Sequence, residues 1–186
     1  MTEEINKCLE VLKKGQLILY PTETIWAVGC DATNEEAVKK VYDLKEQEPG
    51  NGLICLVAND AMLERHIPEV PELAYDLMDV SESPITLVYD NPKGIASNAL
   101  AKDGSLAVRV VSDKFCRYLI NAYRKPLIAT SARTSQNPIP KTTEDIERSI
   151  LKEVDYVVPL PSKISNGSRS SIIKIGNDSS VKIIRN

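Results

Sequence analysis

The sequence predicts one α/β domain spanning residues 1–186, and three observations support that prediction. Segments rich in bulky apolar residues, as in strands, alternate with segments whose apolar residues recur at helical spacing. A chain of 186 residues with 42% hydrophobic residues fits one domain with a substantial core. The last two candidate strands, residues 171–175 and 181–184, are joined by the turn sequence GNDSS, which predicts a hairpin and therefore a mixed sheet.

The elements of the first half follow from apolar spacing and from residues that begin or end helices. Gly15 is well placed to end the first helix, and Thr33 or Asn34 can cap the second. Pro21 is expected to end the first strand, and the sequence EPGNG interrupts the chain after the second helix. The expected order is a helix at 3–14, a strand at 16–20, a helix at 35–45, a strand at 53–58, a helix at 71–80 and a strand at 85–89.

The second half continues the alternation. Thr142 or Thr143 can cap its last helix, and the polar sequence LPSKISNGSRS is a loop of the kind that carries function or disorder. The expected order is a strand at 106–111, a helix at 112–123, a strand at 127–130, a helix at 142–151, a strand at 154–158 and the closing pair of strands.

Charge is distributed unevenly along the chain. The net charge is −3, but the part from Pro161 onward carries +4 and the rest carries −7. A local basic surface can attract phosphate groups, and it can equally serve only for solubility. Both interpretations of the basic stretch stay open.

Cysteine and histidine usage argue against a metal site. The four cysteines form no C-x-x-C pair and lie in apolar surroundings, which favours reduced thiols in a cytoplasmic protein. His66 is the single histidine, and its neighbours Glu64 and Arg65 favour an exposed position at a helix end. No apolar run approaches the ~20 residues of a membrane span, and the acidic N-terminus does not resemble a signal peptide.

Two polar clusters directly follow predicted strands. They are residues 21–24 after Tyr20 and residues 131–133 after Thr130. Loops at strand ends often bind ligands in α/β proteins, although Ser, Thr and Asn also favour plain turns. Neither a Rossmann fingerprint nor a P-loop is present, so a bound nucleotide would need cations and hydroxyls from separate loops.

Two cations are candidates for such a site. Lys45 ends a helix just before a Gly-rich loop, where it can also simply complement the helix dipole. Arg109 lies inside the apolar strand sequence LAVRVV, where an unpaired charge is costly. Arg109 must therefore face solvent or a carboxylate, and a buried ion pair is the alternative to a ligand-binding role.

Four segments occur in order along the chain: YPTETIWAVGCDATNEEAVKKVYDLK, SLAVRV, KPLIATSA, and SSIIKI followed by IIR. Together they resemble the YrdC-like family, whose best-known members are threonylcarbamoyl-AMP synthases of tRNA modification. Each motif is short, but their order and spacing cover nearly the whole chain. The resemblance implies a twisted mixed sheet with flanking helices and a concave, basic cavity.

The resemblance also implies an activity. Active family members combine L-threonine, bicarbonate and ATP into threonylcarbamoyl-AMP and pyrophosphate, and Mg²⁺ is expected to accompany ATP. A partner complex then transfers the threonylcarbamoyl group to tRNA, and some members are described as binding double-stranded RNA. The partners implied are therefore these small substrates, tRNA or double-stranded RNA, and other tRNA-modification proteins, with no membrane.

Carried over motif by motif, the resemblance implies a threonine side and a nucleotide side of one site. A guanidinium fork suits a carboxylate, and hydroxyls suit the polar ends of an amino acid. The expected threonine side consists of Thr24, Arg109, Ser131 and Ser170. The expected nucleotide side consists of Lys45, Gln47, Asn51, Ser105, Arg133 and Arg185. Lys45 and Arg109 are the expected catalytic residues, and no metal ligands are expected.

The departures from the family pattern fall mainly on the nucleotide side. Gln47 stands where the Lys-x-Arg motif ends in arginine, and Arg133 stands where the SAN motif ends in asparagine. Asn51 replaces a frequent lysine, and Ser83 replaces a glycine before the P-[IV]-T strand. One charge-assisted hydrogen bond contributes ~1.5–3 kcal/mol, whereas an arginine that stabilises phosphoryl transfer contributes ~10³–10⁵ in rate. Gln47 therefore predicts that binding is retained while the chemistry is slowed.

Three functional hypotheses follow. The first is a threonylcarbamoyl-AMP synthase with an altered ATP site. The second is a non-catalytic paralogue that binds nucleotide or double-stranded RNA. The third is an α/β domain with an unknown ligand. An acidic chain without an RNP-like aromatic motif limits RNA contact to the backbone, and such contact would be sensitive to salt.

Overall fold

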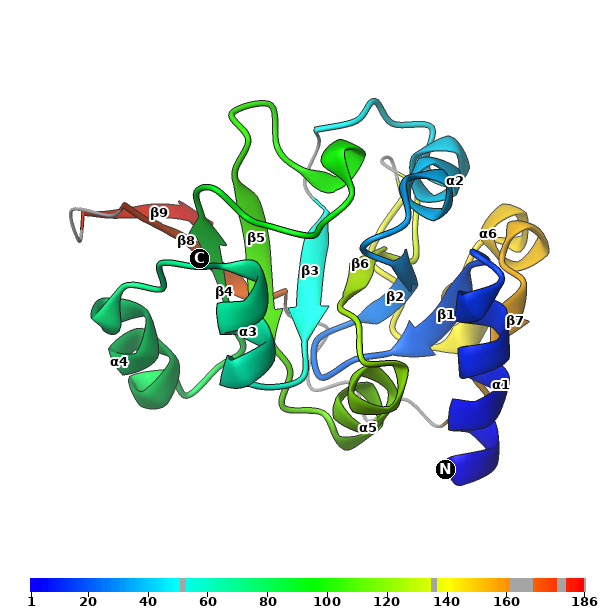
Figure 1. The fold of residues 1–186 in the computed structure, drawn as a ribbon. Helices are drawn as coiled ribbons and strands as arrows, with labels where there is room; N and C mark the ends of the chain where they lie inside the picture. Colours follow the sequence, from blue (N-terminus) through cyan, green and yellow to red (C-terminus); the bar gives the residue numbers. More distant parts are fainter. Residues whose placement is uncertain (51–52, 135–136, 161–168, 177–179, 186) are drawn as a thin grey trace.

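A single mixed sheet forms the centre of the molecule (Figure 1). The computed structural model describes residues 1–50, 53–134, 137–160, 169–176 and 180–185. Within these residues the strand order is β7-β1-β2-β6-β3-β5-β4-β8-β9. The strands are β1 (Ile18–Pro21), β2 (Trp26–Asp31), β3 (Ile54–Val57), β4 (Ile85–Tyr89), β5 (Leu106–Val110), β6 (Leu127–Ser131), β7 (Tyr156–Val157), β8 (Ser171–Ile175) and β9 (Val181–Arg185).

Helices flank the sheet (Figure 1). In Figure 1, α1 and α5 lie close together, and the Tyr123 hydroxyl at the end of α5 donates a hydrogen bond of 3.2 Å to the carbonyl of Leu12 in α1. The helices are α1 (Thr2–Lys13), α2 (Glu35–Lys45), α3 (Asp60–His66), α4 (Glu72–Val80), α5 (Lys114–Tyr123) and α6 (Arg148–Glu153), with short 3₁₀ turns η1 (Ser97–Ala99) and η2 (Thr143–Asp145).

The predicted fold class is confirmed, and several local signals act as expected. The sheet is mixed, because β3 and β5 run parallel whereas β3 and β6 run antiparallel. Asn34 caps α2 by accepting a hydrogen bond of 3.1 Å from the N–H of Ala37. Gly15 follows α1 with a φ of +66°, a left-handed conformation that glycine adopts without strain.

Three local predictions are wrong or incomplete. Pro21 ends β1 as expected, but as the last residue of the strand, where it pairs with Trp26 at the start of β2. Neither β2 nor the short helix α3 was predicted as a separate element. The predicted helix at 142–151 is divided into η2 and α6, because Ile146 adopts an extended backbone and its side chain is buried.

Burial also corrects the prediction for His66. Its side chain ends α3, as the sequence suggests, but only 9% of it is exposed. Its Nδ1 lies 2.9 Å from the carbonyl oxygen of Lys93, so the ring forms part of the packing between α3 and the chain that follows β4. The four cysteines are buried free thiols, in agreement with their apolar sequence context.

Close packing of the central strands requires a glycine in β2. A Cβ atom on Gly29 would lie 2.3 Å from the carbonyl oxygen of Ile128 in β6 and 2.7 Å from the ring of Tyr20 in β1. No side chain fits at such distances. At the opposite end of the sheet, β9 is an edge strand that pairs with β8 and exposes Val181, Ile183 and Ile184.

Candidate active site

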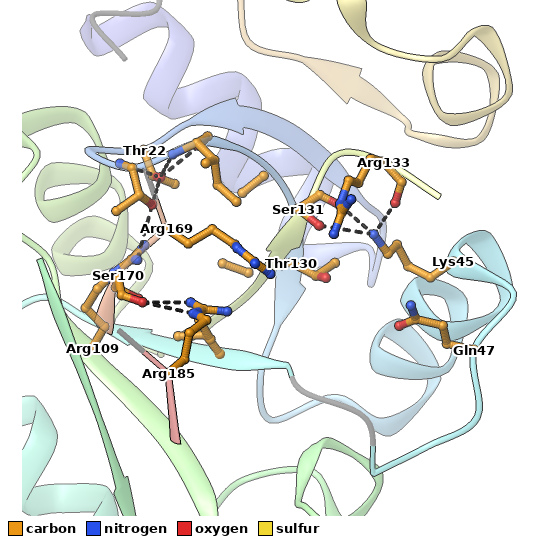
Figure 2. A pocket seen from close by; sticks show the side chains of 15 residues that line it. Thr22, Lys45, Gln47, Arg109, Thr130, Ser131, Arg133, Arg169, Ser170 and Arg185 are labelled. Atoms are coloured by element: carbon orange, nitrogen blue, oxygen red, sulfur yellow. Dashed lines mark hydrogen bonds between the residues drawn. The ribbon is translucent and has the colours of Figure 1, made fainter. Parts of the chain in front are cut away.

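A cavity of about 170 Å³ lies against the central strands (Figure 2). Its walls come from the β1–β2 turn, the end of α2, β5, β6 with the residues that follow it, and the chain around β8 and β9. Pockets for drug-sized ligands typically measure ~300–1,000 Å³. The cavity therefore suits a small molecule such as an amino acid, and a whole nucleotide would extend beyond it.

Small side chains on neighbouring strands form part of the cavity lining. Ala27 in β2 pairs with Ser131 in β6, and Ile54 in β3 pairs with Ala129 in β6. Paired residues of adjacent strands point to the same face of a sheet, and these four line the cavity. Alanine at two of these positions leaves space above the sheet that a larger side chain would occupy.

The β1–β2 turn is organised by the Thr22 hydroxyl. Its Oγ1 accepts hydrogen bonds from the N–H groups of Thr24 and Ile25, at 3.2 and 3.1 Å, and donates to the carbonyl of Ile25 at 2.8 Å. Thr24 Oγ1 lies 3.0 Å from Thr22 Oγ1. Either hydroxyl can be the donor in this contact.

Glu23 lies between these threonines and forms an ion pair with Arg109 of β5. The Nε atom of Arg109 is 2.9 Å from Glu23 Oε1, and the two side chains are only 5% and 11% exposed. Arg109 Nη1 also donates to Thr24 Oγ1 at 3.2 Å. A buried guanidinium needs such a partner, so the carboxylate between the hydroxyls explains how Arg109 can lie inside an apolar strand. Arg109 thus forms a buried ion pair and also lines the cavity.

Ser170 and Arg185 form the wall near β8 and β9. The Ser170 hydroxyl lies 2.7 Å from the hydroxyl of Thr86 in β4. The Ser170 carbonyl accepts hydrogen bonds from Nε and Nη2 of Arg185, at 3.1 and 2.8 Å. These bonds fix the Arg185 guanidinium beside the cavity, where burial and the nearby charges of Arg169 and Arg109 lower its pKa.

Lys45, the last residue of α2, reaches across the cavity to the end of β6 (Figure 2). Its ammonium donates to the carbonyl oxygen of Ser131 at 2.7 Å, to that of Arg133, and more weakly to Ser131 Oγ at 3.4 Å. The side chain is 3% exposed. Burial, and to a smaller extent the charge of Arg133, lower the pKa of Lys45 to about 8, whereas Glu147 acts in the opposite direction.

The two residues that depart from the family pattern lie near Lys45. Gln47 and Arg133 both line the cavity, and both are partly exposed. Arg133 Nη1 donates to the carbonyl oxygen of Asn137, so the guanidinium is held by its own loop. The cationic group therefore stands on the β6 side of the cavity and the neutral amide on the α2 side.

The cavity is strongly basic although the protein is acidic. Five cations line it: Lys45, Arg109, Arg133, Arg169 and Arg185. None of the described lining residues is acidic. From the basic C-terminal stretch, Arg169 and Arg185 line the cavity, whereas Lys174 does not. Lys174 instead pairs with Asp90 at 3.1 Å and with Asp103 at 3.0 Å.

Eight of the ten residues predicted from the sequence line this one cavity. The exceptions are Ser105 and Asn51. Ser105 is buried, its hydroxyl donates to Asp103 at 2.6 Å, and it is not among the lining residues. Asn51 lies outside the described residues. The contacts of each residue with a ligand stay predictions.

The cavity also contains residues to which the sequence analysis assigned no role in the site. Thr22 and Thr130 contribute, as do the alanines on β2 and β6. Thr130 directly precedes Ser131, so its position at a strand end was a usable signal. The alanines were a weaker signal, since small residues in strands otherwise rich in Val, Ile and Leu mark places where space is left free.

The described part of the chain contains neither a metal-binding cluster nor a membrane-spanning helix. No group of three or more His, Cys, Asp or Glu residues there is arranged to hold a metal ion. No helix in the described ranges has the length and apolar character needed to cross a membrane. The donor set of the cavity, which consists of cations, amides and hydroxyls, does not fit a resident Mg²⁺ ion.

Residues 10–186 match the Sua5/YciO/YrdC family, whose description reads "Telomere recombination". The chain belongs to this family. It is 30% identical to the threonylcarbamoyl-AMP synthase of Vibrio campbellii over 185 residues, which cover 94% of this chain and all of the relative. It is 29% identical to the protein of the same name from Vibrio parahaemolyticus, again over 94% of this chain and 100% of the relative.

Solved structures of the family have the same fold. P. abyssi Sua5 complexed with L-threonine matches 92% of this chain with a TM-score of 0.82 and 26% identity. This chain covers 50% of that Sua5 chain, which is therefore about twice as long as the domain described here. E. coli YciO matches 100% of this chain and 90% of its own, with a TM-score of 0.85 and 21% identity, and supports the fold alone.

Proposed function

We propose that this protein is a nucleotidyltransferase that forms threonylcarbamoyl-AMP and pyrophosphate from L-threonine, bicarbonate and ATP. One observation carries the proposal: Thr24, Arg109, Ser131 and Ser170, from four separate segments, line one small basic cavity. These are the residues that the family resemblance assigns to the threonine side. Relatives that carry the synthase name align over nearly the whole chain, and P. abyssi Sua5 has been solved with L-threonine.

The reaction asks the cavity to hold three polar reactants together. The neutral threonine amine forms a bond to the bicarbonate carbon with loss of water. An oxygen of the resulting carbamate then attacks the α-phosphorus of ATP, and the bond to the β-phosphate oxygen breaks to release pyrophosphate. In this proposal Arg109 and the hydroxyls hold threonine, while Lys45, Arg133 and Arg185 hold the phosphates. Most of the acceleration would come from orientation and from charge stabilisation. Mg²⁺ would enter with ATP, as part of the substrate.

The altered nucleotide side predicts a slow enzyme. A cation on the β6 side can still attract a triphosphate, because charge attraction is less directional than a bidentate hydrogen bond. Stabilising a transition state is more demanding, since donors must point to where charge develops. We therefore expect ATP to bind and the turnover to be well below that of a family member with an intact Lys-x-Arg motif.

A pyrophosphate-release assay tests the proposal directly. Purified protein with ATP, Mg²⁺ and bicarbonate should release pyrophosphate only when L-threonine is added, and the adenylate product should be detected by mass spectrometry. D-Threonine and L-valine are the matched controls for the substrate. Release that does not depend on L-threonine, or no release together with no threonine binding by calorimetry, contradicts the proposed activity. Efficient turnover contradicts only the prediction that the altered ATP site slows the reaction.

The second candidate is a non-catalytic paralogue that binds nucleotide or double-stranded RNA. It is favoured by the combination of a basic cavity with Gln47 in place of a motif arginine. Fluorescence anisotropy with a labelled RNA duplex at two salt concentrations tests it, because backbone contacts weaken steeply as salt rises. RNA binding without threonine-dependent pyrophosphate release would favour this candidate over the enzyme.

The wider role follows from the proposed product. Threonylcarbamoyl-AMP is a mixed anhydride, so a second protein must transfer its acyl group to tRNA, and we place both steps in the cytoplasm. Complementation of a strain that lacks its own synthase, with tRNA modification measured by mass spectrometry, tests this placement.

A further inference from the structure

The segment that follows β6 is held by a carboxylate from outside that segment. Glu147 Oε1 accepts hydrogen bonds from the N–H and the hydroxyl of Thr134, at 2.7 and 3.0 Å, and Oε2 lies 3.1 Å from the same hydroxyl. The backbone N–H of Thr134 is the main cause that lowers the pKa of Glu147. Thr134 is thus fixed through both its main chain and its side chain by one charged group.

Glu147 reaches Thr134 because of the break in the predicted helix. It directly precedes α6 with φ −58° and ψ 137°, yet its side chain forms no cap on that helix. In the continuous helix that the sequence pattern favours, Glu147 would be an interior helical residue with a different side-chain direction. A local preference that is overridden in this way often marks a functional position.

Thr134 lies next to the groups that hold Lys45. The Lys45 ammonium is bound by the carbonyl oxygens of Ser131 and Arg133, and the N–H of Arg133 donates to the Ser131 carbonyl at 2.8 Å. The peptide that joins Arg133 to Thr134 contains both the carbonyl that contacts Lys45 and the N–H that contacts Glu147. Holding one end of this peptide therefore orients the other.

We propose that Glu147 is a positioning residue of the cavity, which through Thr134 holds the carbonyl groups of Ser131 and Arg133 on the Lys45 ammonium. The inference deepens the proposed function, since it rests on Lys45 belonging to the nucleotide side. The link itself concerns contacts within this chain, so it can be measured without turnover.

The direct measurement is the reactivity of the Lys45 amine. Acetylation by acetic anhydride at fixed pH, followed by mass spectrometry, reports how accessible and how firmly held each lysine is. Glu147→Ala should accelerate acetylation of Lys45 by about tenfold, the size expected for losing a charge-assisted hydrogen bond. Part of this acceleration comes from the lower Lys45 pKa once the Glu147 charge is gone, so Thr134→Val, which keeps that charge, isolates the positioning. Thr134→Val should accelerate it by about threefold, since the main-chain bond stays. Lys39, which is 63% exposed on the outer face of α2, is the internal reference in every sample.

Glu153→Ala is the matched control variant. Glu153 ends the same helix, is exposed, and does not line the cavity. Its removal should leave Lys45 acetylation within about twofold of wild type. In parallel, Glu147→Ala should raise the dissociation constant for ATP by about tenfold and that for L-threonine by a smaller factor, because Lys45 and Arg133 belong to the nucleotide side and Ser131 to the threonine side.

The outcomes separate the two proposals. Wild-type rates of Lys45 acetylation in a folded Glu147→Ala protein overturn the positioning role. If that variant does not fold, Thr134→Val and Glu147→Gln decide instead, and unchanged acetylation in both overturns it. Faster acetylation in a protein whose wild type releases no threonine-dependent pyrophosphate would sustain the positioning role while the proposed reaction fails.

Discussion

Two cationic walls of the cavity, one at Arg109 and one at Lys45, are held by different partners. Arg109 is paired with a carboxylate, Glu23, so most of its charge is balanced inside the protein. Lys45 is bound by the carbonyl oxygens of Ser131 and Arg133, which are dipoles and leave its full charge in place. A balanced guanidinium suits a zwitterionic amino acid, because it offers directed N–H groups without a large field. An unbalanced ammonium suits a polyanion such as a triphosphate.

The two walls also differ in the substitutions that they tolerate. The Arg109 wall closes on itself through Glu23, Thr24 and Thr22, and a change in one member leaves another buried without its partner. The Lys45 wall depends on loop carbonyls and has exchangeable side chains beside it, namely Gln47 and Arg133. This agrees with the family resemblance, which assigns the retained motifs to threonine and the changed motifs to the nucleotide.

The largest effect is expected from Arg109→Ala, which tests whether Glu23 balances the charge of Arg109. Removing the guanidinium leaves the Glu23 carboxylate buried without its ion-pair partner, so the free energy of unfolding should fall by about 3–5 kcal/mol. Urea denaturation measures this loss, and calorimetry should show no L-threonine binding. The double variant Glu23→Gln with Arg109→Met should be less destabilised than Arg109→Ala, since no unpaired charge remains. Equal stability of Arg109→Ala and wild type would contradict a stabilising ion pair between Glu23 and Arg109.

The next largest effect concerns the exchange on the second wall. Gln47→Arg combined with Arg133→Asn should raise threonine-dependent pyrophosphate release by at least ~10-fold, because the arginine returns to its family position. Each single change should raise the rate less. Gln47→Arg alone places an arginine at both positions, and Arg133→Asn alone leaves an arginine at neither position. Initial rates at saturating substrates give the comparison. If the fold-changes in rate of the two single variants multiply to give the fold-change of the double variant, the two positions act independently.

The pH dependence of ATP binding sharpens the contrast, because only the second wall contains a group that titrates near neutrality. The pKa of Lys45 is lowered to about 8, so its ammonium is charged below that pH and is lost above it. ATP affinity should therefore fall as the pH rises through about 8. Arg133→Asn removes a nearby positive charge and should move this fall to higher pH. Titration calorimetry between pH 6.5 and 9.5 is the measurement, and a flat ATP profile would contradict the assignment of Lys45 to this wall.

The smallest effect separates cations that face the cavity from those that do not. Arg169 is exposed at the cavity, so Arg169→Ala should weaken ATP binding by about threefold and reduce its salt dependence. Lys174 already pairs with Asp90 and Asp103, so Lys174→Ala should leave ATP affinity unchanged. Equal losses in the two variants would mean that the C-terminal stretch acts through its general charge alone.

The sequence predicted the members of the cavity better than their contacts. Thr24 and Arg109 are 85 positions apart, and their hydrogen bond agrees with the shared site that motif resemblance implied. The ion pair of Arg109 with Glu23 was one of two open roles, because nothing local in strand β5 identifies the partner. The burial of Lys45 was not predicted, since a lysine in the last turn of a helix has an adequate local role. Ile146 shows the same limit, because the spacing of its neighbours favours a helix, whereas in the structure its backbone is extended and its side chain is buried in the core.

Arg185 lies on β9, and this location ties the cavity to the least protected part of the sheet. An edge strand with exposed side chains on its outer faces opens by local fluctuation more readily than the central strands do. Each opening of the β8–β9 hairpin withdraws Arg185 from the Ser170 carbonyl and removes one wall of the cavity. A ligand that contacts Arg185 therefore binds only the closed form and stabilises it by mass action. Occupancy of the cavity should thus be readable, without any label on the ligand, as slower hydrogen exchange at the amides of the C-terminal hairpin.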